Sequence, residues 1–426
     1  MSLINDQRIL LLEITNEFTC GKKPLNEVID YFYNHKVATE IKNKRAKKKN
    51  ILTILCRKLF DIDNIIDQLT KKNISKRNEI VRNCVRIAII ELLELKRPAY
   101  AVINSWVEIA KNKKRLLNFS KLINAVLRKA IREGTQSNLI ESKKIPNWLW
   151  QSWSETYGET ESLKIINASL SEPPLDLNYI ASNENFLNLK MTLPDSYRLI
   201  NPGKINEIEG FEDGKWWVQD AGATIPVNIL GEVKNKEVLD LCSAPGGKAM
   251  HLMSKGARVT CVEISKTRIA TMKENFQRTK SNPKIICDDV LKFETDKKFD
   301  FILLDAPCSA TGTIRKNPDL IHIKDKNDIN RNVHLQKLLL KRAMEFLSDK
   351  GVLVYCVCSL EFEEGEGQIK GLLDQNEMYV QMPIQEKDYP EYKAFITKDG
   401  FIRTLPHLLN DGGIDGFFIS KLHKKF

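Results

Sequence analysis

The sequence predicts an α/β protein in which a doubly wound, Rossmann-like parallel sheet follows an all-helical domain. From residue 236 onward, short β-branched apolar runs alternate with helical segments, as in doubly wound sheets. Residues 1–133 instead have apolar residues three and four positions apart, without the alternation of strands. The 426 residues, 42% of them apolar, suffice for two or three domains with cores. We expect a helical domain at 1–135, a small helical and mixed α/β module at 145–220, and the Rossmann-like domain at 221–426.

The N-terminal segment carries all of the excess positive charge. Residues 1–133 hold 28 lysines and arginines against 14 aspartates and glutamates, whereas the formal charge of the whole chain is +11. Basic clusters at 42–50, 71–77 and 111–115 concentrate this charge. A solvated helical surface would explain part of it, but three clusters in one segment favour a face that binds a polyanion, most simply RNA.

A polar stretch and a short module are expected between the two large domains. Residues 133–144 are typical of a linker. Trp148, Trp150 and Trp153 follow it and are expected to pack a small helical subdomain rather than to stack on bases. Short alternating pieces between residues 173 and 218 indicate a small mixed α/β module.

Five short apolar runs are predicted to be the strands of the large sheet: 237–242, 258–264, 284–289, 299–307 and 351–359. The helix before the last of them is expected to cover 334–351 and to end at Gly351. In such sheets, ligands bind beyond the carboxyl ends of the strands. The stretches that carry chemistry all lie at these ends, which predicts a binding cleft there.

The first strand end leads into a glycine-containing loop, VLDLCSAPGGK, at 238–248. Its adjacent glycines allow the backbone to approach a ligand closely, and Asp240 could accept hydrogen bonds from an amine. Glu263, at the end of the next strand, suits two ribose hydroxyls, and Asp288 could hold an adenine amino group. The pattern lacks G-x-G-x-x-G and describes an adenosine cofactor without a pyrophosphate. S-adenosylmethionine fits best, and a purely structural loop is the alternative.

The fourth strand end carries LLDAPCSATG, residues 303–312. Asp305 arrives on an apolar strand and should be partly buried, and Pro307 stiffens the loop that presents Cys308. A lone buried cysteine would ordinarily fill a core. The Asp-x-Pro-Cys order in a loop over the cofactor cleft favours a functional thiol instead.

The fifth strand end carries two cysteines one residue apart. Cys356 is expected within the strand as a small buried residue, and Cys358 is expected to project into the cleft from the strand's tip. A zinc site is not indicated, because this pair has no second pair at the spacing of a zinc finger and the six histidines are dispersed.

Two thiols and a carboxyl group beside a methyl donor suit methylation at carbon 5 of a pyrimidine. Carbon 5 is a poor nucleophile until a thiolate adds to carbon 6 and makes carbon 5 enamine-like. A carboxylic acid at ring nitrogen 3 would stabilise the developing charge, and Asp305 is expected there. A base must then remove the proton from carbon 5 before the thiol can leave. Methylation of a nitrogen would need no thiol.

These stretches resemble the RNA 5-methylcytosine methyltransferases, and more closely the bacterial ribosomal RNA small subunit methyltransferase B (Sun/Fmu) family. CSAPGGK is similar to the family's C-A-A-P-G-G-K, DAPCSATG to D-A-P-C-S-x-x-G, and VCSLEFEEG to T-C-S with a following acidic pair. WWVQDAGA and DGFFISKLHK resemble the segment before the cofactor loop and the closing strand. VINSWVEIAK and LINAVLRKA resemble the helical RNA-binding domain of the antitermination factor NusB, so the resemblance spans essentially the whole chain.

The resemblance implies S-adenosylmethionine-dependent methylation of carbon 5 of a cytosine in small-subunit (16S) ribosomal RNA, with the NusB-like domain docking the RNA. It makes Cys358 the nucleophile and Cys308 the residue that assists product release, with Asp305 as the third catalytic residue. The implied cofactor site comprises Cys242, Ser243, Ala244, Pro245, Gly246, Gly247, Lys248, Glu263, Asp288 and Asp305.

The chain departs from the family pattern at four positions. Val357 replaces the usual threonine before the nucleophile, and Gly365 replaces an asparagine after the acidic pair. Glu263 stands where aspartate is common. Asn178 stands where arginine is usual, which predicts a weaker RNA contact there. None of these changes removes a group that the mechanism needs.

Three other functions remain open at this point. A transfer-RNA 5-methylcytosine methyltransferase would use the same catalytic residues, and only the NusB-like segment speaks against it. A DNA cytosine methyltransferase would attack from a Pro-Cys motif, which would make Cys308 the nucleophile. A NusB-like RNA-binding or antitermination factor could carry an inactive methyltransferase fold, although Asp305, Cys308 and Cys358 are all present.

Composition also sets expectations about the protein's surroundings. The 9 cysteines are odd in number and scattered, which suits a reducing cytoplasm better than a disulfide framework. No apolar run reaches the length of a membrane span, and the first residues do not form a signal peptide. We therefore expect a cytoplasmic monomer that uses neither a metal nor a membrane.

Overall fold

The computed structural model describes residues 3–35, 45–70, 74–133, 140–179, 189–199 and 203–425. These residues form two compact units, Met1–Gln151 with Asn317–Lys324, and Ser152–Lys316 with Asp325–Phe426. Residues 42–44 and 71–73 of the basic clusters, and residues 134–139 of the expected linker, lie outside the described ranges. The three domain boundaries expected from the sequence stay a prediction.

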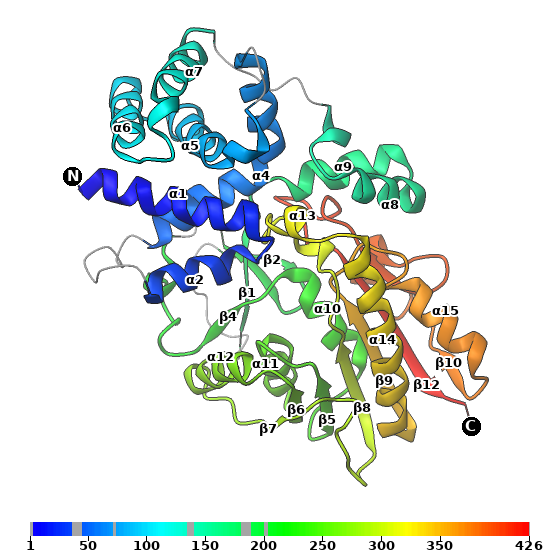
Figure 1. The fold of residues 1–426 in the computed structure, drawn as a ribbon. Helices are drawn as coiled ribbons and strands as arrows, with labels where there is room; N and C mark the ends of the chain where they lie inside the picture. The colour runs from blue at the N-terminus through cyan, green and yellow to red at the C-terminus, as the bar shows by residue number, and fades with distance from the viewer. Residues whose placement is uncertain are drawn as a thin grey trace. The chain divides into compact units, whose positions relative to one another are not determined.

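The first unit is built of helices, as the apolar spacing predicts (Figure 1). They are α1 (Leu3–Gly21), α2 (Leu25–His35), α4 (Arg45–Leu69), α5 (Glu79–Ile89), a π-helical turn (Ile90–Glu94), α6 (Ala99–Asn112), α7 (Ser120–Glu133) and the short α13 (Leu320–Ile323). A buried carboxylate crosses their core, since Glu91 accepts hydrogen bonds from Arg8 and from the indole of Trp106. The ion pair with Arg8 compensates Glu91 for the loss of water around its charge.

The helix α13, within the segment Asn317–Lys324, belongs to this unit although the residues before and after that segment in the sequence belong to the second unit. Its preceding residue Asp319 accepts a hydrogen bond from the backbone N–H of Leu25 at 2.9 Å. His322 stacks on Phe60, and its Nε2 lies 2.7 Å from the carbonyl oxygen of Cys56. Burial lowers the pKa of His322 to about 4, so this ring is neutral at ordinary pH.

A small antiparallel sheet opens the second unit, after α8 (Asn147–Tyr157) and α9 (Glu159–Ser169). Its strands are β1 (Leu175–Tyr179), β2 (Leu189–Leu193), β3 (Ser196–Leu199) and β4 (Trp216–Val218), in the order β2-β3-β1-β4. Trp153 is buried, as expected. Asn178 is also buried and donates a hydrogen bond to Gln219 at 3.2 Å.

The large sheet has the strand order β10-β12-β9-β8-β5-β6-β7, with β11 paired to β12. Its parallel strands are β5 (Glu237–Leu241), β6 (Arg258–Glu263), β7 (Lys284–Cys287), β8 (Phe299–Asp305) and β9 (Leu347–Val357), each at a position predicted from the sequence. Three strands at the carboxyl-terminal end of the chain complete it: β10 (Tyr379–Gln381), β11 (Ile402–Thr404) and β12 (Phe417–Lys424), of which β12 runs antiparallel to β9.

Helices cover both faces of this sheet (Figure 1). The helices α10 (Ala221–Leu230), α11 (Gly247–Ser254) and α12 (Lys266–Arg278) share one buried cluster with Leu303 of β8 and Val354 of β9. The helix α14 (Lys326–Phe346) packs with their neighbours Leu304 and Tyr355, and α15 (Glu366–Gln375) joins it there. Alternate residues of each strand therefore enter opposite layers, as a doubly wound sheet requires.

The expected end of α14 at Gly351 is wrong, because the helix ends at Phe346 and β9 begins at Leu347. The glycine serves the sheet instead. A Cβ atom at Gly351 would lie 2.9 Å from the carbonyl oxygen of Phe299 on β8 and 2.7 Å from a methyl carbon of Leu347. Only glycine allows the two strands to approach this closely.

Among the described residues, no helix is long and apolar enough to cross a membrane. The same residues contain no group of three or more histidine, cysteine or acidic side chains that could hold a metal ion.

Candidate active site

The loop between β5 and α11 approaches the sheet edge closely, because Gly246 adopts the left-handed conformation with φ of 98°. A Cβ atom there would lie 3.0 Å from the ring of Phe276. Glycine is therefore required on two grounds, its positive φ and its close contact. Gly247 then begins α11, whose first turn leaves backbone N–H groups free for a ligand.

Asp240 lies beneath this loop on β5 and is fully buried. Neither of its carboxylate oxygens has a hydrogen-bond partner among the described residues. Burial, followed by the negative charge of Asp305, raises the pKa of Asp240 to about 8. A buried carboxyl group without a partner is costly unless a ligand completes it. The observation fits a cofactor that presents a cationic amine, as S-adenosylmethionine does.

The two further acids predicted for the cofactor lie at the expected strand ends. Glu263 closes β6, is buried, and accepts hydrogen bonds from the backbone N–H groups of Ala244 at 3.3 Å and Ser265 at 2.9 Å. Its carboxylate thus links the end of β6 to the glycine-containing loop. Asp288 directly follows β7, and its Oδ1 accepts a hydrogen bond from the backbone N–H of Asp289 at 2.8 Å.

A partly buried ion pair joins the glycine-containing loop to the fourth strand end. Lys248 Nζ lies 2.7 Å from Asp305 Oδ2. Burial disfavours the charge of Lys248, but the Asp305 carboxylate outweighs this effect and the pKa of Lys248 is raised. The other carboxylate oxygen of Asp305 accepts from the thiol of Cys356 at 3.5 Å. Cys356 is buried in β9 as expected, and it also contacts Asp305, which is predicted to act on the base.

The two cysteines predicted to be catalytic lie next to each other. The Sγ atoms of Cys308 and Cys358 are 3.5 Å apart, although 50 residues separate them in the sequence. The hydrogen bond with Cys358, together with burial, raises the pKa of Cys308 well above the ordinary value of a thiol. Cys308 is therefore protonated at neutral pH, and its sulfur shares a hydrogen bond with that of Cys358.

Backbone hydrogen bonds between the two strand ends fix this sulfur pair. Ala306 donates to the carbonyl oxygen of Cys356 at 3.0 Å, and Gly312 donates to that of Cys358, also at 3.0 Å. Gly312 must be glycine, because a Cβ atom there would overlap the backbone of Gly416. The geometry of the pair thus follows from the parallel pairing of β8 with β9.

A buried cluster of four charges near the start of α10 was missed by reasoning from residue chemistry. Asp220 caps α10 and pairs with Lys316, which also contacts Asp415, and Arg315 completes the group. The two cations outweigh the effect of burial and lower the pKa of Asp220 to about 2. Burial and the charge of Asp220 raise the pKa of Asp415 to about 6. The only sequence signal was the family resemblance of WWVQDAGA and DGFFISKLHK, which contain the two acids.

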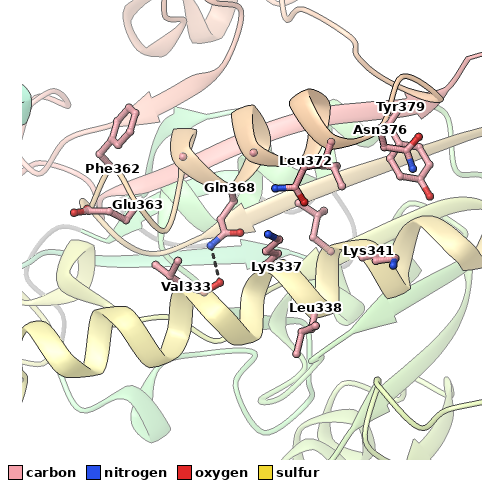
Figure 2. Close-up of a pocket in the computed structure, with 14 residues that line it drawn as sticks. Val333, Lys337, Leu338, Lys341, Phe362, Glu363, Gln368, Leu372, Asn376 and Tyr379 are labelled. Carbon is pink, nitrogen blue, oxygen red and sulfur yellow. Dashed lines mark hydrogen bonds between the residues drawn. The ribbon is translucent and has the colours of Figure 1, made fainter.

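A groove of about 580 Å³ between α14 and α15 is separate from these residues (Figure 2). None of its lining residues belongs to the predicted site. One of them, Gln368, donates a hydrogen bond to Gln336, which in turn donates to the carbonyl oxygen of Pro307 beside Cys308.

Comparisons with known proteins identify the family of the chain. Residues 227–423 match the family described as 16S rRNA methyltransferase RsmB/F, and residues 5–132 match the NusB family. Two relatives are each named ribosomal RNA small subunit methyltransferase B. The protein from Pasteurella multocida is 30% identical over 87% of this chain and 86% of its own. The one from Yersinia pseudotuberculosis is 32% identical over 90% of this chain and 92% of its own.

A solved structure of NSun6 from Pyrococcus horikoshii has a similar fold, with a TM-score of 0.56 and 21% identity. The similarity covers 66% of this chain and 98% of that one.

Proposed function

Because the chain belongs to the 16S rRNA methyltransferase RsmB/F family, we propose that it methylates carbon 5 of a cytosine in small-subunit ribosomal RNA. The observation that carries the proposal is the pair of sulfur atoms, Cys308 and Cys358, held 3.5 Å apart beside Asp305 at adjoining strand ends. Methyl transfer to a carbon needs covalent activation of the base, for which one thiol suffices. A second thiol beside the first suits the removal of the covalent bond afterwards.

S-adenosylmethionine is the proposed methyl donor, and it supplies an electrophilic methyl group. Residues Cys242–Lys248 would hold it, and Asp240 would accept from its amine, Glu263 from its ribose hydroxyls and Asp288 from its adenine amino group. The unpartnered carboxyl group of Asp240 supports this assignment, because a cationic amine would give it the partner that the protein lacks.

Cys358 acts as the nucleophile. Its sulfur forms a bond to carbon 6 of the cytosine, and the electron pair of the carbon 5–carbon 6 double bond becomes available at carbon 5. Asp305, in its carboxylic acid form, donates a proton toward ring nitrogen 3 and so stabilises the negative charge that develops on the ring. Lys248 holds Asp305 in place by its ion pair at 2.7 Å. Cys356 donates to the same carboxylate and orients it.

Cys308 assists product release. In the resting protein its pKa is raised by the hydrogen bond with Cys358, by burial and by the charge of Cys358. Once Cys358 is bound to carbon 6 as a neutral thioether, its charge and its acceptor capacity are reduced, and Cys308 can lose its proton to water more easily. The Cys308 thiolate then takes the proton from carbon 5. The electrons of that C–H bond restore the double bond, and the carbon–sulfur bond breaks to return the Cys358 thiolate.

The helical unit is proposed to hold the RNA by its phosphates. Its basic stretch 111–115 lies within the described residues, where Lys113 pairs with Glu13 and Leu116 is buried beside it. A cytosine in a loop or single strand is the proposed target, because a stacked base must first be flipped to reach a cleft. The nine cysteines are free thiols, which supports a reducing cytoplasm as the place of action.

Covalent trapping tests the assignment of the two cysteines. Cys308→Ala and Cys358→Ala proteins are incubated with S-adenosylmethionine and unmodified small-subunit RNA, then separated on a denaturing gel. We expect a protein–RNA adduct to accumulate with Cys308→Ala, and neither adduct nor product with Cys358→Ala. The reverse pattern would make Cys308 the nucleophile.

Transfer RNA in a parallel incubation is the control for the substrate class. Methylation of transfer RNA in preference to small-subunit RNA would replace the proposed substrate. RNA binding without methyl transfer to either would favour a binding factor.

A further inference from the structure

The buried carboxylate of Glu364 forms hydrogen bonds with Ser309, the residue after Cys308. Glu364 is fully buried in the segment after β9, and its Oε1 accepts a hydrogen bond from the backbone N–H of Ser309 at 2.9 Å. Its Oε2 accepts a second hydrogen bond from the Ser309 hydroxyl. Both bonds act on the residue that directly follows the thiol, so they restrict the rotation of the Cys308 backbone.

Gln336 on α14 holds the other side of the same thiol. Its amide nitrogen donates to the carbonyl oxygen of Pro307 at 2.9 Å and to Glu364 Oε1 at 3.2 Å. Pro307 and Ser309 are thus both anchored, with Cys308 between them. Gln336 is completely buried, so water does not compete for these bonds.

Gln368 on α15 fixes the orientation of the Gln336 amide. Its side-chain nitrogen donates to the carbonyl oxygen of Val333 at 2.8 Å, the contact drawn as a dashed line in Figure 2, and to Gln336 Oε1 at 3.3 Å. With its oxygen occupied by Gln368, Gln336 must turn its nitrogen toward Pro307. The hydroxyl of Tyr355 donates to the backbone carbonyl oxygen of Glu364 at 2.7 Å and so fixes the backbone of Glu364.

We propose that Glu364 is a positioning residue for product release, which acts with Gln336 to hold Cys308 against the Cys358 sulfur and against carbon 5 of the methylated base. This inference rests on the proposed function for its chemical step, in which the carbon 5 proton moves to the Cys308 thiolate and the Cys358–carbon 6 bond breaks. Formation of that bond depends on Cys358, which directly follows β9 and whose carbonyl oxygen accepts a hydrogen bond from the backbone N–H of Gly312. Release depends on the placement of Cys308, which Glu364 and Gln336 control.

The test uses Glu364→Gln, with Gln336→Met as a second variant that removes the Pro307 anchor without a change of charge. In single-turnover incubations with small-subunit RNA, we expect methyl transfer within about threefold of wild type and at least about tenfold more covalent adduct, a free-energy difference of about 1.4 kcal/mol. Cys308→Ala is expected to show the same pattern, in which methyl transfer continues while the covalent adduct accumulates. A variant that merely unfolds would lose methyl transfer and adduct together.

Two neighbouring glutamates are matched controls. Glu361 is also buried, but its carboxylate accepts from Ser152 and from the indole of Trp153 at 3.0 Å, and Glu361→Gln should accumulate no adduct. Glu363 is exposed, and Glu363→Gln should behave as wild type. Adduct with Glu361→Gln equal to that with Glu364→Gln would overturn the proposal.

A second measurement does not depend on RNA. Alkylation of Cys308 by iodoacetamide, mapped by mass spectrometry, should be several-fold faster in Glu364→Gln and in Gln336→Met than in wild type, because the loop is no longer held. Unchanged alkylation and unchanged adduct in both variants would refute the role of Glu364. Faster alkylation together with no methyl transfer by the wild type would instead reject the proposed function and leave the clamp on Cys308 standing.

Discussion

At the scale of single residues, the site depends on groups whose surroundings change their chemistry. Cys308 and Cys358 lie in contact, and the hydrogen bond between them, together with burial, raises the pKa of Cys308. Asp240 and Asp305 are both carboxyl groups near the same loop, yet Lys248 forms its ion pair with Asp305, and the carboxylate oxygens of Asp240 are buried without a hydrogen-bond partner among the described residues. The division of tasks within each pair follows from burial and from neighbours.

We expect Asp240 to release a proton when the cofactor binds. With its pKa raised to about 8, the buried carboxyl group is protonated at pH 7, and a cationic amine beside it favours the ionised form. Binding of S-adenosylhomocysteine at pH 7 should therefore release about one proton. Calorimetry in buffers of different ionisation enthalpy measures this release, which Asp240→Asn should abolish. Buffer-independent enthalpies for the wild type would contradict the assignment.

The same residue predicts how stability changes with pH when no cofactor is bound. The folded pKa of Asp240 lies above the unfolded value near 4, so the unfolded chain binds fewer protons between these values. The contribution of Asp240 to the free energy of unfolding is therefore fully present below about pH 4 and falls as the pH rises toward 8. Urea unfolding of wild type and Asp240→Asn at pH 5 and pH 8 isolates it, and the difference should favour the variant more at pH 8.

Gly365 explains one departure from the family pattern. A Cβ atom there would lie 2.5 Å from a guanidinium nitrogen of Arg403 and 2.8 Å from the ring of Phe418. Arg403 is buried, pairs with Glu366 and donates to the carbonyl oxygen of Ser359, which directly follows Cys358. Gly365→Asn, which restores the family residue, should lower the free energy of unfolding by about 1–3 kcal/mol through overpacking. Chemical denaturation checks this, and a stabilised variant would show that Arg403 can move.

At the scale of elements, the strand ends were predictable and the contacts between them were not. Alternating apolar runs placed Asp305 and Cys358 at neighbouring strand ends, because parallel strands bring their carboxyl ends to one edge. The ion pair of Lys248 with Asp305 and the bonds of Glu364 to Ser309 join residues 57 and 55 positions apart. No local pattern encodes such partners, since they depend on how loops pack after the sheet has formed.

The end of α14 shows why one local signal misled. Glycine after an apolar helical run ordinarily indicates a helix end. In this chain Gly351 is required inside β9, where it lies against β8, and the helix stops five residues earlier. Both uses of glycine leave the same letter in the sequence, and only the sheet partner distinguishes them.

At the scale of the whole molecule, the chain passes between its two compact units more than once. It leaves the helical unit after Gln151, returns to it for Asn317–Lys324, and then re-enters the catalytic unit at Asp325. The returning segment directly follows Lys316, which belongs to the buried charge cluster of the catalytic unit. A protein without residues 1–144 would therefore lack the packing partners of α13, including Phe60 and the Cys56 carbonyl.

Such a truncated protein should be cut by protease within 317–324 at least about tenfold faster than the full chain, because a segment without burial or hydrogen bonds opens readily. Mass spectrometry of the first fragments locates the cut. His322→Ala in the full chain is the milder comparison and should accelerate cleavage less. Equal resistance of the truncated and full-length proteins would show that α13 is held by the catalytic unit alone.

Because of the returning segment, the NusB-like part is not joined to the rest of the protein by a single linker. Severing the backbone once between α7 and α8 would not set it free, because Asp319 and His322 would still bind Leu25 and Cys56 by hydrogen bonds. The segment Asn317–Lys324, which lies within the catalytic half of the sequence, is thus part of the helical unit. A recombination event that exchanged the first third of the gene would have to exchange eight residues near position 320 as well.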